Sequence, residues 1–247
     1  MDAGSVIMLA TLIFAAALLY SSVGHAGASG YLAAMALFGL APAVMKPTAL
    51  TLNILVAAIA TAKYYKAGYF SWSLFWPFAL ASIPCAYIGG LLTLPGIAYK
   101  PLVGAVLFYA AWRSLREAGK PTVTEVKPPP PAVAVVSGGG LGLLSGLTGV
   151  GGGIFLTPLL VLRGWAEIRQ VSGVTAAFIL VNSVAGLLGV VSAKTALPVA
   201  LPVWAAAAMV GGYIGSAYGS RRLGGPAIKR LLAIVLAVAG FKMFITI

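Results

Sequence analysis

Long apolar runs alternate with short polar stretches along almost the whole chain. The pattern predicts ten apolar helical segments, at residues 5–23, 28–40, 48–62, 72–94, 98–112, 132–148, 151–162, 172–192, 198–218 and 227–245. A helix needs about 20 residues to cross the hydrocarbon core of a bilayer, and several of these runs are that long. The segments 28–40 and 151–162 are too short to cross alone, so we expect half-helices or tilted partners of the segments before them. The predicted fold class is an all-α integral membrane protein.

Two glycine-rich stretches each lie between the end of one apolar segment and the start of the next. Residues 21–30 read SSVGHAGASG, and residues 145–155 read SGLTGVGGGIF. Glycine weakens a helix by about 1 kcal/mol relative to alanine, so these stretches predict broken or re-entrant helices. At membrane depth, irregular backbone survives only where it is buried in protein or lines a cavity. A matched pair of interrupted segments therefore indicates the substrate site of a transporter.

One polar, proline-rich linker, residues 113–131, divides the chain into two membrane repeats, 1–112 and 132–247. Each repeat holds five predicted segments. Because five is odd, two similar repeats would enter the membrane from opposite sides, which predicts an inverted repeat. If the short segments do not cross, three crossings remain in each repeat and the inversion is kept.

The positions of the basic residues predict the orientation. If all ten segments cross, twelve of the sixteen Lys and Arg residues lie on the linker side, and Lys46, Lys100, Lys194 and Lys242 lie on the other. Loops next to membrane segments carry more Lys and Arg on the cytoplasmic side. We therefore expect a cytoplasmic linker and both termini outside.

Composition narrows the function classes. The chain is 61% hydrophobic and 8% charged, whereas a soluble domain carries about 25% charged residues. Its net charge of +12 comes from bases at the ends of apolar runs and not from a basic groove, so we expect no nucleic-acid partner. One histidine, one cysteine (Cys85) and no carboxylate within any predicted segment leave too few groups for a metal site, a cofactor site or a catalytic triad, so we expect no enzyme.

The second glycine stretch, GLTGVGGG at 146–153 followed by IFLTP, together with the weaker copy around 24–27, resembles the TauE/SafE family of sulfite and organosulfonate transporters. The likeness covers essentially the whole chain. It implies an inner-membrane carrier of small sulfur-containing anions such as sulfite, sulfoacetate or related sulfonates. The first copy departs from the pattern, so the two half-sites should differ chemically: His25, Ala26 and Ala28 stand where the second copy has Val150, Gly151 and Gly153.

An anion inside a membrane needs hydrogen-bond donors and positive potential without several buried charges. Helix N-termini supply both, through unpaired N–H groups and a partial charge of about +0.5. We expect the starts of the two short segments to point at a common site. Backbone amides are expected from Gly24, Gly27, Gly149, Gly151, Gly152 and Gly153, and hydroxyl donors from Ser22, Ser29, Ser145 and Thr148. The alternative is tight helix packing with no ligand.

Five further residues are candidates for the site. His25, the sole histidine, has an unperturbed pKa of about 6.5 and could contact the anion, carry a coupled proton or serve the structure only. Asn53 and Asn182 hold corresponding places and could face the substrate or a broken helix. Lys46 and Arg169 could attract an anion at a cavity mouth or anchor the protein at the interface. Thr48, Thr51, Ser172, Thr175 and Ser183 belong to the same polar neighbourhood.

The favoured interpretation is a secondary carrier that exports a sulfur oxyanion or sulfonate by alternating movement around a midplane site, with a proton as the candidate coupling ion. A channel-like anion pore and a non-transporting accessory subunit are the alternatives. The expected partners are the small anion, the lipid bilayer and, as a candidate assembly, a second copy in a homodimer.

Overall fold

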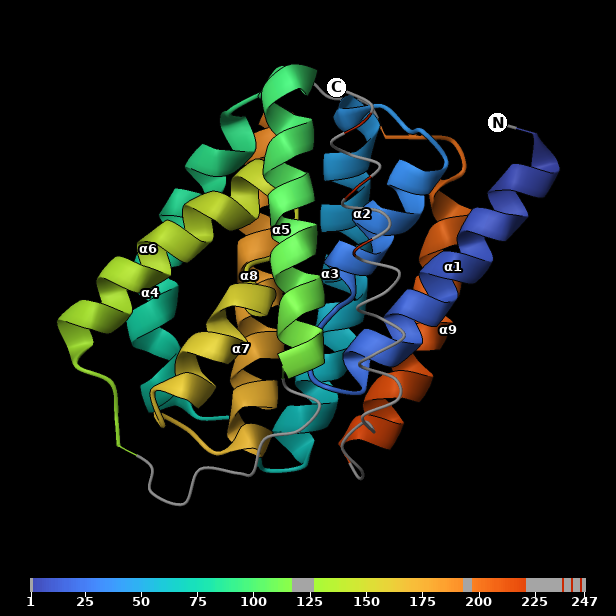
Figure 1. Cartoon of the computed structure of the whole chain (residues 1–247). Coiled ribbons are helices and arrows are strands. Elements are labelled where there is room, and N and C mark those ends of the chain that lie inside the picture. Colours follow the sequence, from blue (N-terminus) through green and yellow to red (C-terminus); the bar gives the residue numbers. More distant parts are fainter. Residues whose placement is uncertain are drawn as a thin grey trace.

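The computed structural model describes residues 2–116, 127–192 and 197–220, together with residues 237, 241 and 245. All regular structure in these residues is helical, which confirms the predicted all-α membrane fold (Figure 1). Apart from residues 237, 241 and 245, the tenth predicted segment, 227–245, falls outside these residues, as does the middle of the expected linker. The helices are α1 (Ala3–Ser21), α2 (Ala28–Leu37), α3 (Pro42–Lys66), α4 (Trp72–Leu91), α5 (Gly96–Arg116), α6 (Pro131–Thr148), α7 (Gly153–Leu162), α8 (Ile168–Ser192) and α9 (Leu201–Gly219).

Helix length agrees with a membrane protein. Five of the described helices, α1, α3, α4, α6 and α8, are long and apolar enough to cross a bilayer. The helices α2 and α7 have ten residues each. They span about 15 Å, which is half of a hydrocarbon core about 30 Å thick. The two short segments predicted after the glycine stretches are therefore short in the structure as well.

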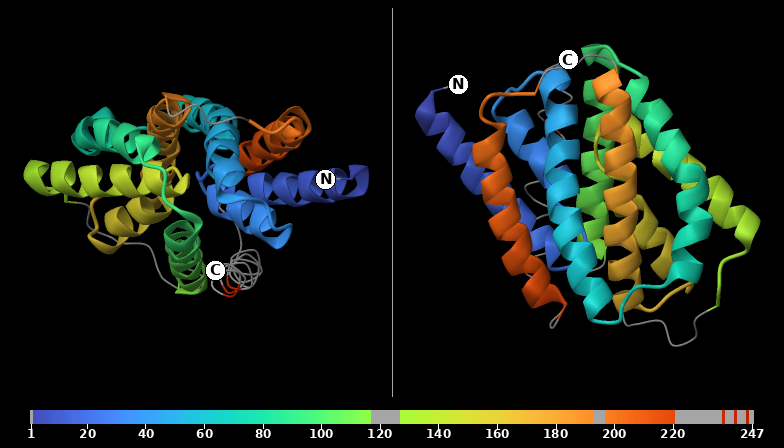
Figure 2. Two further views of the ribbon diagram at one scale, coloured as in Figure 1. Left: turned by 90° about the horizontal axis from the view of Figure 1, so that it is seen from above. Right: turned by 180° about the vertical axis from the view of Figure 1, so that it is seen from behind.

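The helices form two flanks around a central pair. Helix α1 packs along α9 on one flank, α4 packs along α6 on the other, and α3 and α8 run between them (Figures 1 and 2). Leu50 lies against Gly186, and Ala60 packs with Ala176, so α3 and α8 are antiparallel. Each flank therefore joins a helix from the part of the chain before the linker to a helix from the part after it.

Glycines at four-residue spacing allow both flanks to pack backbone to backbone. A Cβ atom at any of six glycines would lie 2.0–2.4 Å from a carbonyl oxygen of the facing helix. On α6 the glycines 138, 142 and 146 face the carbonyls of Phe78, Ser82 and Ala86, and on α9 the glycines 211, 215 and 219 face those of Phe14, Leu18 and Ser22. We call these two sets of contacts the glycine ladders. In both, residue numbers rise together, so each pair of helices is parallel, with the close approach that small residues permit between membrane helices.

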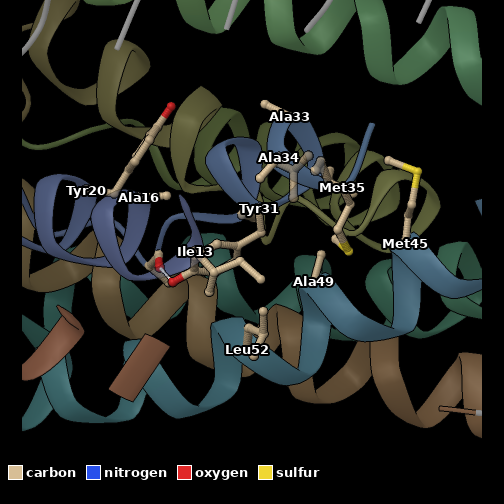
Figure 3. Packing of buried hydrophobic residues seen from close by; sticks show 14 of the residues in the cluster. Ile13, Ala16, Tyr20, Tyr31, Ala33, Ala34, Met35, Met45, Ala49 and Leu52 are labelled. Atoms are coloured by element: carbon tan, nitrogen blue, oxygen red, sulfur yellow. Dashed lines mark hydrogen bonds between the residues drawn. The ribbon is translucent and has the colours of Figure 1, made fainter. Parts of the chain in front are cut away.

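The short helix α2 is enclosed by protein. Every residue from 28 to 36 is buried, and Figure 3 shows side chains of α1, α2 and α3 packed together, with Tyr31 among them. The irregular backbone before α2 is thus shielded from lipid, as backbone at membrane depth requires.

Several helix boundaries differ from the sequence prediction by three to six residues, among them the start of α3 and the end of α5. Helix α3 begins at Pro42, six residues before the predicted start, and includes Lys46 and Pro47. The helix accommodates this lysine because its ammonium group finds carbonyl acceptors on α4. Helix α5 continues to Arg116, so the first four residues of the expected linker are helical.

Candidate functional site

Both glycine stretches break a helix where the sequence predicted. Gly24 and Gly27 have φ values of +80° and +105°, and Gly149, Gly151 and Gly152 have values between +78° and +82°. Residues with a Cβ rarely adopt this left-handed conformation. Gly27 and Gly152 are the N-cap residues of α2 and α7, and neither helix has a side-chain capping hydrogen bond. The first N–H groups of these helices lack intrahelical partners, so they can donate to an anion.

A narrow pocket brings residues of the two stretches together. It has room for about one water molecule. An anion with several heavy atoms can therefore bind only if the two stretches move apart. The lining comprises Tyr20 and the segment 25–29 from the N-terminal half of the chain, and Val150, Ile154 and Ile179 from the C-terminal half.

His25 connects the first stretch to α7. Its Nδ1 lies 3.2 Å from the carbonyl oxygen of Val23, and its Nε2 lies 3.2 Å from Oγ1 of Thr157. A carbonyl only accepts, so neutral His25 carries its proton on Nδ1 and accepts at Nε2 from Thr157. Thr157 Oγ1 is also 3.0 Å from Oγ1 of Thr175 on α8. Thr157 was not among the predicted site residues, although it lies two residues after the second stretch, next to Pro158.

A second polar group lies beside Gly151. A Cβ atom there would be 2.8 Å from Nδ2 of Asn53 and 3.1 Å from Oγ of Ser183. Among the residues that the structure describes, both amide atoms of Asn53 and the hydroxyls of Ser183 and Ser145 are buried without a hydrogen-bond partner. Asn182 differs in part: its Nδ2 donates to the carbonyl of Phe178 at 2.8 Å, whereas its buried Oδ1 has no partner among the described residues.

The two predicted cations lie elsewhere. The buried Nζ of Lys46 donates to the carbonyls of Gly89, Gly90 and Leu92, each at 3.0 Å, at the C-terminal end of α4. A cation is favoured there, because the last carbonyls of a helix are unpaired and carry partial negative charge. Arg169 is exposed at the start of α8, and its Nη1 donates to the hydroxyl of Tyr69 at 2.8 Å. Their predicted roles in attracting anions remain predictions.

The remaining predicted residues support the broken helices. The hydroxyls of Ser22 and Thr148 donate to the carbonyls of Leu19 and Leu144 within their own helices. Ser29 is buried in the pocket wall. Three glycines closely approach distant helices: Gly24 lies near Ser172, Gly149 near the backbone of Lys46, and Gly153 near Thr175 and Ile179.

The pocket is short of metal-binding groups. The described residues contain no cluster of three His, Cys, Asp or Glu side chains. The two carboxylates that the structure describes lie outside the pocket. Asp2 caps α1 with its pKa lowered by hydrogen bonds from Ser5, and Glu167 is exposed before α8.

Comparisons with known proteins agree with this architecture. The chain is 42% identical over 238 residues to the probable membrane transporter protein y4hK of Sinorhizobium fredii (strain NBRC 101917 / NGR234), an alignment that covers 95% of this chain and 96% of that protein. No solved structure matches. The model of the sulfite exporter TauE/SafE family matches residues 9–243. The chain is therefore a multi-pass membrane protein that belongs to the sulfite exporter TauE/SafE family of membrane transporters.

Proposed function

We propose that this protein is a secondary transporter that exports a small sulfur-containing anion, such as sulfite, sulfoacetate or a related organosulfonate, across the inner membrane. The observation that carries the proposal is the pair of short helices, each starting at a left-handed glycine and bordering one pocket. Two helix starts supply N–H donors and positive potential without a buried cation. The name of the matched family supports a sulfur anion as the substrate.

Transport by this site requires a change of shape. The narrow pocket corresponds to a closed arrangement, in which residues of both stretches line the same small cavity. An anion between them would hold the stretches apart and accept hydrogen bonds from N–H groups at a helix start. A gap that opens first to one side and then to the other would carry the anion across.

His25 is the residue that would couple transport to protons. A proton on Nε2 turns that atom from an acceptor into a donor, so the hydrogen bond from Thr157 must reorganise. The positive imidazolium would then favour an anion in the pocket. Binding of the proton and of the anion would strengthen each other, as proton-coupled transport requires.

The proposed mechanism includes an inverted repeat. In such a repeat, α1 would correspond to α6 and α4 to α9, which would explain why the two flanks match. A pseudo-twofold symmetry axis between α3 and α8 would explain why these two helices are antiparallel. The two repeats would be residues 1–112 and 132–247. The distribution of Lys and Arg supports a cytoplasmic linker and outside termini.

Uptake of labelled sulfite, sulfoacetate and sulfate into proteoliposomes, with and without a pH gradient, tests the proposal. We expect saturable uptake of at least one sulfur anion that responds to the gradient. Flux that rises linearly with concentration would indicate an anion pore. Absence of flux for all three anions would contradict the proposal and favour an accessory subunit.

A further inference from the structure

Two buried polar side chains that border Gly151 from neighbouring helices have no hydrogen-bond partner within the described part of the chain. They are Asn53 on α3 and Ser183 on α8, and both are fully buried. A buried polar group without a partner is costly, above all where neighbouring helices and lipid replace water. Such groups in a native protein call for an explanation, and an intermittently bound ligand is one.

Asn53 and Ser183 lie at the same level of the molecule. The antiparallel helices α3 and α8 touch at Leu50 and Gly186 on one side of this level and at Ala60 and Ala176 on the other. Between these contacts, both polar side chains border the backbone of Gly151. Because Gly151 has no Cβ, the amide of Asn53 and the hydroxyl of Ser183 reach the loop that leads into α7.

The start of α2 differs from that of α7, because a side chain of α2 itself occupies the space next to its first residues. A Cβ atom at Gly27 would lie 2.8 Å from the hydroxyl of Tyr31. That hydroxyl donates to the carbonyl of Ala26, and Tyr31 is fully buried. Ala26 also stands where the second stretch has Gly151, so a methyl group occupies the corresponding place.

We propose that the oxygen atoms of the transported anion bind on one side only, at the start of α7, where Asn53 Nδ2, Ser183 Oγ and the N–H groups of residues 151–153 donate to them. This inference rests on the proposed function and assigns its anion-binding groups. The α2 side contributes His25 and the pocket wall, and it does not bind the oxygens. The amide and the hydroxyl are neutral donors, so the subsite suits an oxyanion head with several acceptor oxygens, such as sulfite or a sulfonate.

The test measures binding and stability of the full chain in detergent. Sulfite and sulfoacetate are titrated calorimetrically into the wild type, Asn53→Leu and Ser183→Ala, and the apparent Tm of each is recorded. Each variant loses a hydrogen bond to a charged ligand, so we expect binding to weaken about tenfold or more. Since each substitution also removes an unpartnered buried group, the Tm should stay the same or rise. Ser216→Ala is the matched control, because this buried serine donates to Gly212 within α9, and binding should be unchanged.

Three results would overturn the inference. Binding within about twofold of wild type in both variants would mean that water satisfies these groups, and the proposed function would stand. A clear fall in Tm in both variants would mean that the groups have protein partners and a structural role. No binding of either probe by the wild type would overturn the proposed function, and the subsite with it.

Discussion

Replacing Gly142 with alanine tests the close packing of α6 against α4. A Cβ atom at this position would lie 2.2 Å from the carbonyl oxygen of Ser82, whereas real Cβ atoms essentially never come within 3.0 Å. The obstacle is backbone, so α6 would have to move away by about 0.8 Å. Overpacking of this kind costs about 1–3 kcal/mol.

Gly140→Ala is the matched control for Gly142→Ala. Both glycines lie on α6, but a Cβ at Gly140 would meet nothing within 4 Å. Both substitutions gain the same helix propensity, about 1 kcal/mol. The difference between the two variants therefore isolates the packing cost.

The assay is thermal unfolding of both variants in detergent, followed by circular dichroism. For a chain of this size, 1 kcal/mol shifts Tm by about 2–4 °C, so Gly142→Ala should melt about 2–12 °C below Gly140→Ala. Equal melting temperatures would refute the backbone contact between α4 and α6.

Three further substitutions test the site. Gly152→Leu should abolish transport but leave the protein in the membrane, because a side chain there is strained at φ +78° and meets Phe178. Gly39→Leu is the control and should keep transport, because Gly39 is also left-handed but faces open space. A Gly152→Leu protein that still transports would refute the site. His25→Ala should flatten the pH dependence of uptake between about pH 5.5 and 7.5, and an unchanged profile would remove His25 from coupling. Lys46→Met should lower the apparent Tm by several degrees, because the carbonyls at the end of α4 lose their hydrogen bonds to the ammonium group, and a hydrogen bond to a charged group contributes about 1.5–3 kcal/mol. An unchanged Tm would show that these hydrogen bonds contribute little to stability.

The helix breaks could be predicted from the sequence because their cause is local. A run of glycines between apolar segments disfavours helix whatever surrounds it, and both breaks lie where the runs are. The four-residue spacing of glycines on α6 and α9 is equally visible in the sequence. Their partners are not visible in the sequence, because the facing carbonyls belong to helices in the other half of the chain.

Contacts between distant residues limited the prediction of the site. A lysine between apolar segments suggests a helix boundary, yet Lys46 lies inside α3. It can do so because the carbonyls that accept from its Nζ lie 43 residues or more away in the sequence, at the C-terminal end of α4. The hydrogen bond between His25 and Thr157 joins residues 132 positions apart. Ser183 could be assigned only to a polar neighbourhood, and its place beside Gly151 depends on how α3 and α8 cross.

The glycine ladders bear on which parts of the molecule can behave as units. Each ladder joins one helix from each half of the chain. Either half alone would therefore expose the backbone surface that the other half covers, like one subunit removed from a domain-swapped dimer. Two half-chains produced as separate polypeptides should therefore associate with each other and not fold singly. We expect α1 with α9 and α4 with α6 to be the units that shift during transport. Each of them carries one glycine stretch, so the pocket would open by separating helix pairs that cut across the order of the sequence.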